Sequence, residues 1–202
     1  MKNQEHTKRL AVMGLMAALC FVGYAVFPAL NAGGTKIHFG NCFVVIAAYL
    51  LGGVPGGLAG AVGLGLADVL CGFAASAPRT FICKFMIGLI AGTVAHKAGH
   101  ITEPGREASV ILRWTIIAAV AGLAFNCVFE PCLKYVWYTI LIPDSDKAAS
   151  AIKALMALNT YATFINAITN SIAAVILYNA LRPVLAKSGM LFRIGKTADS
   201  AN

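Results

Sequence analysis

Charged residues are scarce in this chain of 202 residues, in which Lys, Arg, Asp and Glu together make up 12%. An average soluble domain contains about twice that share. Hydrophobic residues make up 59% of the chain, and the mean hydropathy is +0.77. Because so few charges cannot cover a water-exposed surface of this size, the composition excludes a soluble globular protein and predicts an integral membrane protein.

The sequence is also poor in the patterns that a metal site, a disulfide framework or nucleotide binding would need. The six cysteines lie mostly in apolar segments, where cysteine behaves as a small hydrophobic residue, and none forms a C-x-x-C pair. No G-x-x-x-x-G-K-[ST] motif occurs, so any ATP-driven motor must be another chain. We therefore expect no metal, cofactor, disulfide or catalytic residue.

Six apolar runs predict an all-α integral membrane protein with six transmembrane helices. The runs cover residues 10–30, 41–52, about 54–75, about 80–98, 112–142 and about 161–185. The first run is too long for the core of a signal peptide, so we expect it to be retained. The fifth exceeds one simple span, so either Pro131 kinks it or its outer end projects beyond the bilayer.

The remaining segments complete the predicted topology. Residues 143–158 predict a polar turn and then a short amphipathic stretch, and residues 1–187 form one transmembrane domain followed by a polar tail at 188–202. Six spans put both termini on one side of the membrane. With the N-terminus inside, ten of the 16 Lys and Arg residues lie on inner segments, which favours cytoplasmic termini. The formal net charge of +8 is dispersed in this way, without the patch that nucleic-acid binding needs.

Small residues form stripes on two of the predicted spans. The third span has Gly57, Ala61, Gly65, Asp68 and Gly72 at steps of three or four, and the fourth has a G-x-x-x-G pair. Such stripes let helix backbones approach closely in lipid. They indicate tight internal packing and say nothing about a substrate.

Ionisable residues inside a span are costly and mark candidate functional sites. Asp68 and Lys84 fall at similar depth on consecutive spans, where they pair with each other, contact a ligand, or do both. On the fifth and sixth spans, polar residues recur on one face of the outer half, whereas the first span offers almost none. These residues are Asn126, Glu130 and Lys134 on the fifth span, and Asn159, Thr163, Asn166 and Asn170 on the sixth. The pattern favours an outward-facing ligand pocket over hydrogen bonds that merely join the helices.

Residues 37–95 resemble an S component of energy-coupling factor (ECF) transporters, and most closely the riboflavin-type group. The matching features are I-H-F-G-N before a short helix, a glycine-rich turn, L-A-D, A-P-x-T-F-x-x-K and G-L-x-A-G. The resemblance implies a six-helix subunit of a prokaryotic cell membrane that binds a vitamin or related micronutrient at the outer face. It also implies partnership with a T component and two cytoplasmic ATPases.

The resemblance further suggests particular residues. Small residues on the first helix dock the T component in this family, and the matching positions are Gly14, Ala17 and Ala18. The loop of residues 31–40 acts as a lid in such proteins, although Lys36 also fits a solvated loop. Together with the polar stripes, the candidate substrate-binding residues are Lys36, His38, Asn41, Asp68, Arg79, Lys84, Asn126, Glu130, Trp137, Tyr161 and Asn166.

Other functions remain open at this point. An intramembrane enzyme would need a nucleophile–base pair or metal ligands, and the His96, His100 and Glu103 group falls at a predicted cytoplasmic helix end, where we expect loop residues. A stand-alone secondary transporter would be supported by inverted repeats, which we do not find. Lys and Arg near the pocket are balanced by Asp68 and Glu130, and aromatic residues such as Trp137 can stack on a ring. These residues favour a planar, near-neutral heteroaromatic vitamin. The resemblance implies one of the riboflavin, pyridine or pyrimidine type, because the riboflavin-type group includes members for such compounds.

Overall fold

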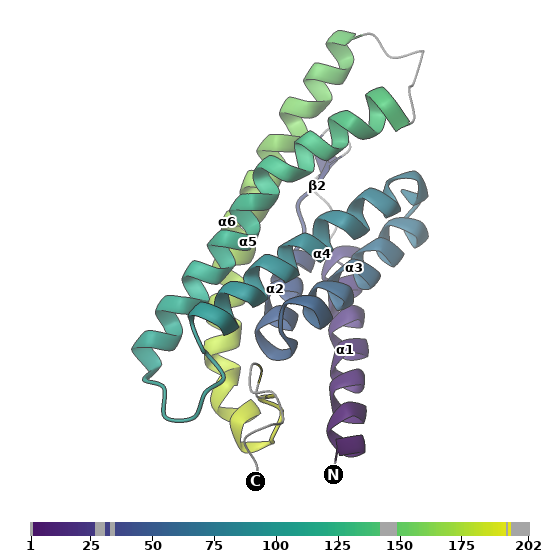
Figure 1. Cartoon of the computed structure of the whole chain (residues 1–202). Helices are drawn as coiled ribbons and strands as arrows, with labels where there is room; N and C mark the ends of the chain where they lie inside the picture. The colour runs from purple at the N-terminus through teal and green to yellow at the C-terminus, as the bar shows by residue number, and fades with distance from the viewer. Residues whose placement is uncertain (1, 27–30, 33–34, 142–148, 193, 195–202) are drawn as a thin grey trace.

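The computed structural model describes residues 2–26, 31–32, 35–141, 149–192 and 194. Over these residues the chain is helical apart from two strands of two residues each, which pair antiparallel (Figure 1). The helices are α1 (Lys2–Ala25), α2 (Gly40–Leu51), α3 (Gly53–Leu70), α4 (Ala77–Thr93), α5 (Ala108–Val136) and α6 (Ala149–Lys187). The strands β1 (Asn31–Ala32) and β2 (Thr35–Lys36) precede α2, and the short helical turns are η1 (Ala74–Ser76), η2 (Val94–Ala98) and η3 (Trp137–Leu141).

Five helical segments are long and apolar enough to cross a membrane. Helix α2 is the sixth, and its 12 residues would reach only about 18 Å along the helix axis, less than the ~30 Å hydrocarbon core of a bilayer. Every residue of α2 except Phe43 is buried, because the other helices surround it. The predicted all-α membrane fold with a short second helix is therefore confirmed.

The helices form two groups that pack against each other (Figure 1). Helices α1 to α4 make one group, with α3 in contact with α1, α2 and α4. Helices α5 and α6 form a long antiparallel pair, which α4 contacts through α5 and α2 contacts through α6. The start of α1 and the end of α6 lie at the same end of the molecule, as six spans require.

The last helix is longer than the sequence pattern predicted. It begins at Ala149, whereas the predicted span began near 161 and the preceding residues were expected to form a separate amphipathic stretch. Residues 149–158 are mostly Ala, Leu, Met and Lys, which favour a helix, so they extend α6 instead. The rest of the predicted polar turn, residues 143–148, lies outside the described residues. Pro131 lies inside α5 and does not end it. The end of α5 and the start of α6 extend past α1 to α4 (Figure 1).

Glycines set the distance between α3 and α4. A Cβ atom at Gly88 would lie 2.4 Å from the Cα of Gly57, and one at Gly92 would lie 2.4 Å from the backbone nitrogen of Gly53. The two G-x-x-x-G pairs therefore bring the backbones of α3 and α4 into direct contact. Gly72 does not belong to this stripe as predicted, because α3 ends at Leu70 and Gly72 occupies a turn with φ +87°.

Other faces of α3 use further glycines in the same way. Gly56 and Gly60 pack on the backbone of Ala48 and the side chain of Val44 in α2, and Gly63 packs on the carbonyl of Ala17 in α1. Helix α3 is thus a nearly smooth rod against which three other helices fit. This rigid group fixes the ends of α1, α2, α3 and α4 relative to one another.

The residues after α6 fold back onto the bundle. Phe192 is buried, and the guanidinium of Arg9 lies 5.1 Å from the centre of its ring. The stretch from 188 onward was predicted to be a polar tail, yet its first residues pack against the end of the molecule that contains both termini.

Candidate functional site

A polar cavity of about 70 Å³ lies at the end of the bundle away from the start of α1 and the end of α6. Its walls come from the last turns of α1 and α3, the first turns of α2 and α4, the later part of α5 and the early part of α6. The lining residues are Tyr24, His38, Asn41, Leu64, Asp68, Phe73, Ser76, Arg79, Thr80, Lys84, Glu130, Lys134, Asn159, Thr163 and Asn166. Polar groups from segments far apart in the sequence thus line one cavity.

Asp68 is held by two hydroxyl groups. The hydroxyl of Tyr24 donates to Oδ1 of Asp68 at 2.7 Å, and the hydroxyl of Thr80 donates to Oδ2. Asp68 is only 5% exposed, so these bonds offset part of the cost of burying its charge. Tyr24 lies in the last turn of α1, which was expected to contribute almost nothing to the site, and that expectation was wrong.

Lys84 pairs with Glu130 rather than with Asp68. Its Nζ lies 3.4 Å from Oε2 of Glu130, and Nδ2 of Asn126 donates to the same oxygen at 2.8 Å. The prediction of an Asp68–Lys84 ion pair is therefore not what the structure shows. Asp68 and Lys84 line the same cavity, but the hydroxyls of Tyr24 and Thr80 occupy the Asp68 oxygens and the long Lys84 side chain reaches across to α5.

A second bridge joins α5 to α6. The ammonium group of Lys134 donates to Oδ1 of Asn159 at 2.9 Å, and Nδ2 of Asn159 lies 3.5 Å from the hydroxyl of Thr163. Lys134 is 8% exposed. It is therefore a buried cation whose hydrogen-bond partner here is a neutral amide.

Two asparagines of α6 hold the backbone at the start of α2. The His38 N–H donates to Oδ1 of Asn166 at 2.9 Å, and Nδ2 of Asn170 donates to the His38 carbonyl at 2.9 Å. Oδ1 of Asn170 accepts from the Cys42 N–H at 2.8 Å in the first turn of α2, where this N–H also donates to the Phe39 carbonyl at 3.1 Å. Asn166 therefore both lines the cavity and holds the segment that enters α2, whereas Asn170 forms hydrogen bonds with backbone groups of that segment and of α2.

Three buried polar groups on two side chains of the cavity wall have no hydrogen-bond partner among the described residues. They are the Nε and Nη1 groups of Arg79 and the Oδ1 atom of Asn41. Arg79 is 8% exposed and Asn41 is 2% exposed. Buried polar groups are nearly always paired, so unpaired ones at a cavity wall are suited to a ligand.

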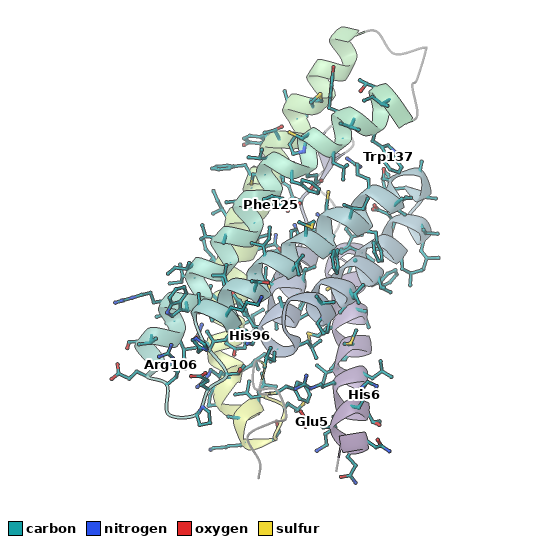
Figure 2. All side chains as sticks on the ribbon, viewed as in Figure 1. Glu5, His6, His96, Arg106, Phe125 and Trp137 are labelled. Carbon is teal, nitrogen blue, oxygen red and sulfur yellow. The ribbon has the colours of Figure 1, made fainter. Side chains whose placement is uncertain are left out.

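Seven of the eleven predicted substrate-binding residues line this cavity: His38, Asn41, Asp68, Arg79, Lys84, Glu130 and Asn166. Asn126 lies behind Glu130 and supports it. Trp137 lies toward the projecting end of α5 (Figure 2), and Tyr161 is 63% exposed, so neither is among the described lining residues. The side chain of Lys36 lies outside the described part of the structure.

The aromatic residues of the wall were missed from sequence. Tyr24 and Phe73 line the cavity, whereas we expected Trp137 and Tyr161. Tyr24 stands alone in an apolar run, and its only signal was its position near the predicted outer end of the first span. Thr80 lies in the A-P-x-T motif and Lys134 lies in the polar stripe of α5, so the sequence contained a signal for both of these lining residues.

The predicted docking residues of α1 do not share one face. Gly14 and Ala18 are exposed, and a Cβ atom at Gly14 would meet no atom within 4 Å. Ala17 is half-buried and its carbonyl packs against Gly63 of α3. Only Gly14 and Ala18 are therefore open to another helix.

His96 is not the loop residue that the sequence predicted. It is 5% exposed within η2, where Nε2 lies 3.1 Å from the Ala48 carbonyl and Nδ1 lies 3.5 Å from the Thr102 hydroxyl. Figure 2 shows it in the half of the bundle away from Trp137. His100 pairs instead with Glu103, at 3.0 Å on the surface, so the two histidines do not act together.

Comparisons with known proteins agree with this architecture. The family model described as the ECF-type riboflavin transporter, S component, matches residues 4–183. A solved structure of the S component of a bacterial ECF transporter superposes with a TM-score of 0.54 and 20% identity, covering 89% of this chain and 98% of that one. At that identity the likeness shows the fold. A search of curated proteins found no match. Because the family model spans nearly the whole sequence, this multi-pass membrane chain belongs to the family of ECF-type riboflavin transporter S components, which are substrate-binding subunits of transporters.

Proposed function

We propose that the chain captures a water-soluble vitamin or vitamin precursor, of the riboflavin, pyridine or pyrimidine type, at the outer face of a prokaryotic cell membrane. It passes the ligand inward as part of an ATP-driven importer with a T component and two cytoplasmic ATPases. The observation that carries the proposal is the polar cavity at the end of the bundle opposite both termini. The excess of Lys and Arg on the segments at the end with the termini supports a cytoplasmic position for that end.

The small size of the cavity sets a condition on ligand capture. Sites for small molecules usually enclose about 300–1,000 Å³, several times the cavity volume of about 70 Å³. A vitamin therefore enters only as lining side chains or helix ends move apart.

The exposed small residues of α1 support a docking surface for the T component. Gly14 and Ala18 leave the backbone of α1 open to close approach by another helix, with no atom within 4 Å of a Cβ at Gly14. Large apolar side chains flank them, since Leu10 and Leu15 are 61% and 56% exposed. We assign this face to the T component.

The test is a binding titration of the detergent-purified chain against a panel of B vitamins and precursors, without ATP. The chain has two tryptophans, and Trp137 lies at the cavity end whereas Trp114 lies in the early part of α5. A Trp114→Phe variant isolates the Trp137 fluorescence, and Trp137→Phe is the matched control that reports from the other end. We expect one vitamin to change the Trp137 signal saturably. Failure of every compound to bind the folded protein would contradict the vitamin assignment.

A further inference from the structure

The charges around the cavity do not balance. Three cations line it, Arg79, Lys84 and Lys134, against two carboxylates, Asp68 and Glu130. His38 adds no positive charge while its Nδ1 accepts the Gly40 N–H, at 3.1 Å. The wall therefore has an excess of one positive charge.

The two carboxylates are already engaged elsewhere. Glu130 is bound by Lys84 and Asn126, and Asp68 is bound by the hydroxyls of Tyr24 and Thr80. No ion pair joins Arg79 to an acidic residue of the described chain. Its guanidinium is left as a buried cation with two nitrogen atoms unpartnered at the wall. Glu130 acts on Arg79 electrostatically without forming a direct ion pair with it. A buried charge without a directly bonded counter-ion is costly, so an anion in contact with the guanidinium would stabilise the site.

The surroundings of Arg79 also favour an anion. Arg79 lies in the first turn of α4, where the helix dipole adds partial positive charge, and Ser76 and Thr80 of the same region line the cavity. A guanidinium presents a planar set of donors that matches a carboxylate or phosphate. Asn41 faces the same cavity with an unpartnered acceptor, Oδ1, which suits a ligand N–H or O–H.

We propose that the ligand of this cavity carries a carboxylate or phosphate group that binds Arg79, together with a hydrogen-bond donor that binds Asn41. This inference rests on the proposed function and narrows its substrate class. It departs from the near-neutral ligand that the sequence favoured, because the direct ion pair of the described cavity wall joins Glu130 to Lys84, while Asp68 is bonded by hydroxyl groups.

The test compares pairs of compounds that share a scaffold and differ in one anionic group. Suitable pairs are riboflavin and riboflavin 5′-phosphate, pyridoxine and pyridoxine 5′-phosphate, nicotinamide and nicotinate, and pantothenol and pantothenate. For the pair whose scaffold fits, we expect the anionic member to bind at least about tenfold more tightly than the neutral one. The phosphate and carboxylate pairs distinguish the two kinds of anion.

Variants then assign the preference to Arg79. Arg79→Gln should reduce it to within about twofold, and Arg79→Lys should keep part of it, because lysine retains the charge and loses the planar geometry. Arg106→Gln is the matched control, since Arg106 is a half-buried arginine bonded to the Gly99 carbonyl in the opposite half of the bundle (Figure 2). It should leave the preference unchanged. If Arg79→Gln does not fold, the proposal is still tested by comparing how tightly the paired ligands bind to the wild-type chain and to Arg79→Lys.

Each outcome separates the two proposals. Equal or tighter binding of the neutral member would overturn the anionic ligand while leaving vitamin capture intact. An unchanged preference in Arg79→Gln would overturn the role of Arg79. Absence of binding by every compound would remove the proposed function and this inference together. Loss of binding on adding phosphatidylglycerol to phosphatidylcholine nanodiscs would assign the anion to a lipid headgroup, and would overturn the substrate assignment.

Discussion

Replacing Gly88 with alanine should force α3 and α4 apart. A Cβ atom at Gly88 would lie 2.4 Å from the Cα of Gly57, more than 1 Å inside the ~3.5–4.0 Å at which carbon atoms attract each other. The obstructing atom belongs to the backbone of α3, so no side chain can rotate away. The helices must therefore separate or shift along their axes.

The cost follows from overpacking. Adding one carbon to a closely packed contact typically costs about 1–3 kcal/mol. For a chain of this length, that corresponds to a fall in Tm of roughly 2–12 °C. The measurement is thermal unfolding of the purified chain in one detergent, followed by tryptophan fluorescence and by loss of the monodisperse peak in size-exclusion chromatography.

Two other glycines provide matched controls. A Cβ atom at Gly65 of α3 would have its nearest neighbour at 3.8 Å, and one at Gly14 would have none within 4 Å. Alanine is the better helix former, so Gly65→Ala and Gly14→Ala should leave Tm unchanged or raise it slightly. A Gly88→Ala protein as stable as these controls would refute the inference that backbone contact sets the α3–α4 distance.

Three further predictions concern docking and the cavity. Gly14→Leu and Ala18→Leu should leave ligand binding intact but abolish uptake in cells that supply the T component and ATPases, because a bulky side chain blocks close helix approach. Glu130→Ala should lower the free energy of unfolding by about 3 kcal/mol and abolish ligand binding, since it leaves Lys84 buried without its counter-ion. Tyr24→Phe should cost about 1–3 kcal/mol in detergent unfolding, because Asp68 loses one of its two hydroxyl donors.

Matched variants give these predictions their controls. Val128→Leu changes an exposed residue of α5 and should not affect uptake, and normal uptake by both α1 variants would remove the docking role. Tyr161→Phe removes an exposed hydroxyl and should not change the free energy of unfolding. If Tyr24→Phe were as stable as Tyr161→Phe, that result would count against the buried hydrogen bond. A Lys84→Met/Glu130→Leu double variant should recover stability but not binding. Recovery of binding as well would show that the pair is purely structural.

Position along a helix is easier to infer from sequence than direction around it. Asp68, Lys84 and Glu130 line one cavity, and their similar positions along the predicted spans follow from counting residues at 1.5 Å each. Which of them pair depends on how each helix is rotated and on what its neighbours supply. The hydroxyl of Tyr24, 44 positions away in sequence, decides the partner of Asp68, and no local pattern reveals that.

Errors at helix ends have a different origin. Residues 149–158 mix polar and apolar side chains, which suits an interfacial stretch as well as an extension of α6, and hydropathy alone does not separate the two. His96 was expected in a loop because it follows an apolar run. In the structure, its Nε2 atom lies 3.1 Å from the carbonyl of Ala48 in α2. Helix propensity decides the first case, and a contact between distant segments decides the second.

The smoothness of α3 has a consequence for what sequence comparison can recognise. The stretch that resembled the family, residues 37–95, contains the contacts where a glycine of one helix rests on the backbone of another. Any chain that assembles α2, α3 and α4 in this way must keep these positions nearly empty, whatever molecule it carries. The glycine positions in this stretch therefore reflect how the helices pack and not which molecule is bound. The two residues that we propose to select the cargo, Arg79 and Asn41, lie within the same stretch but take no part in these glycine contacts.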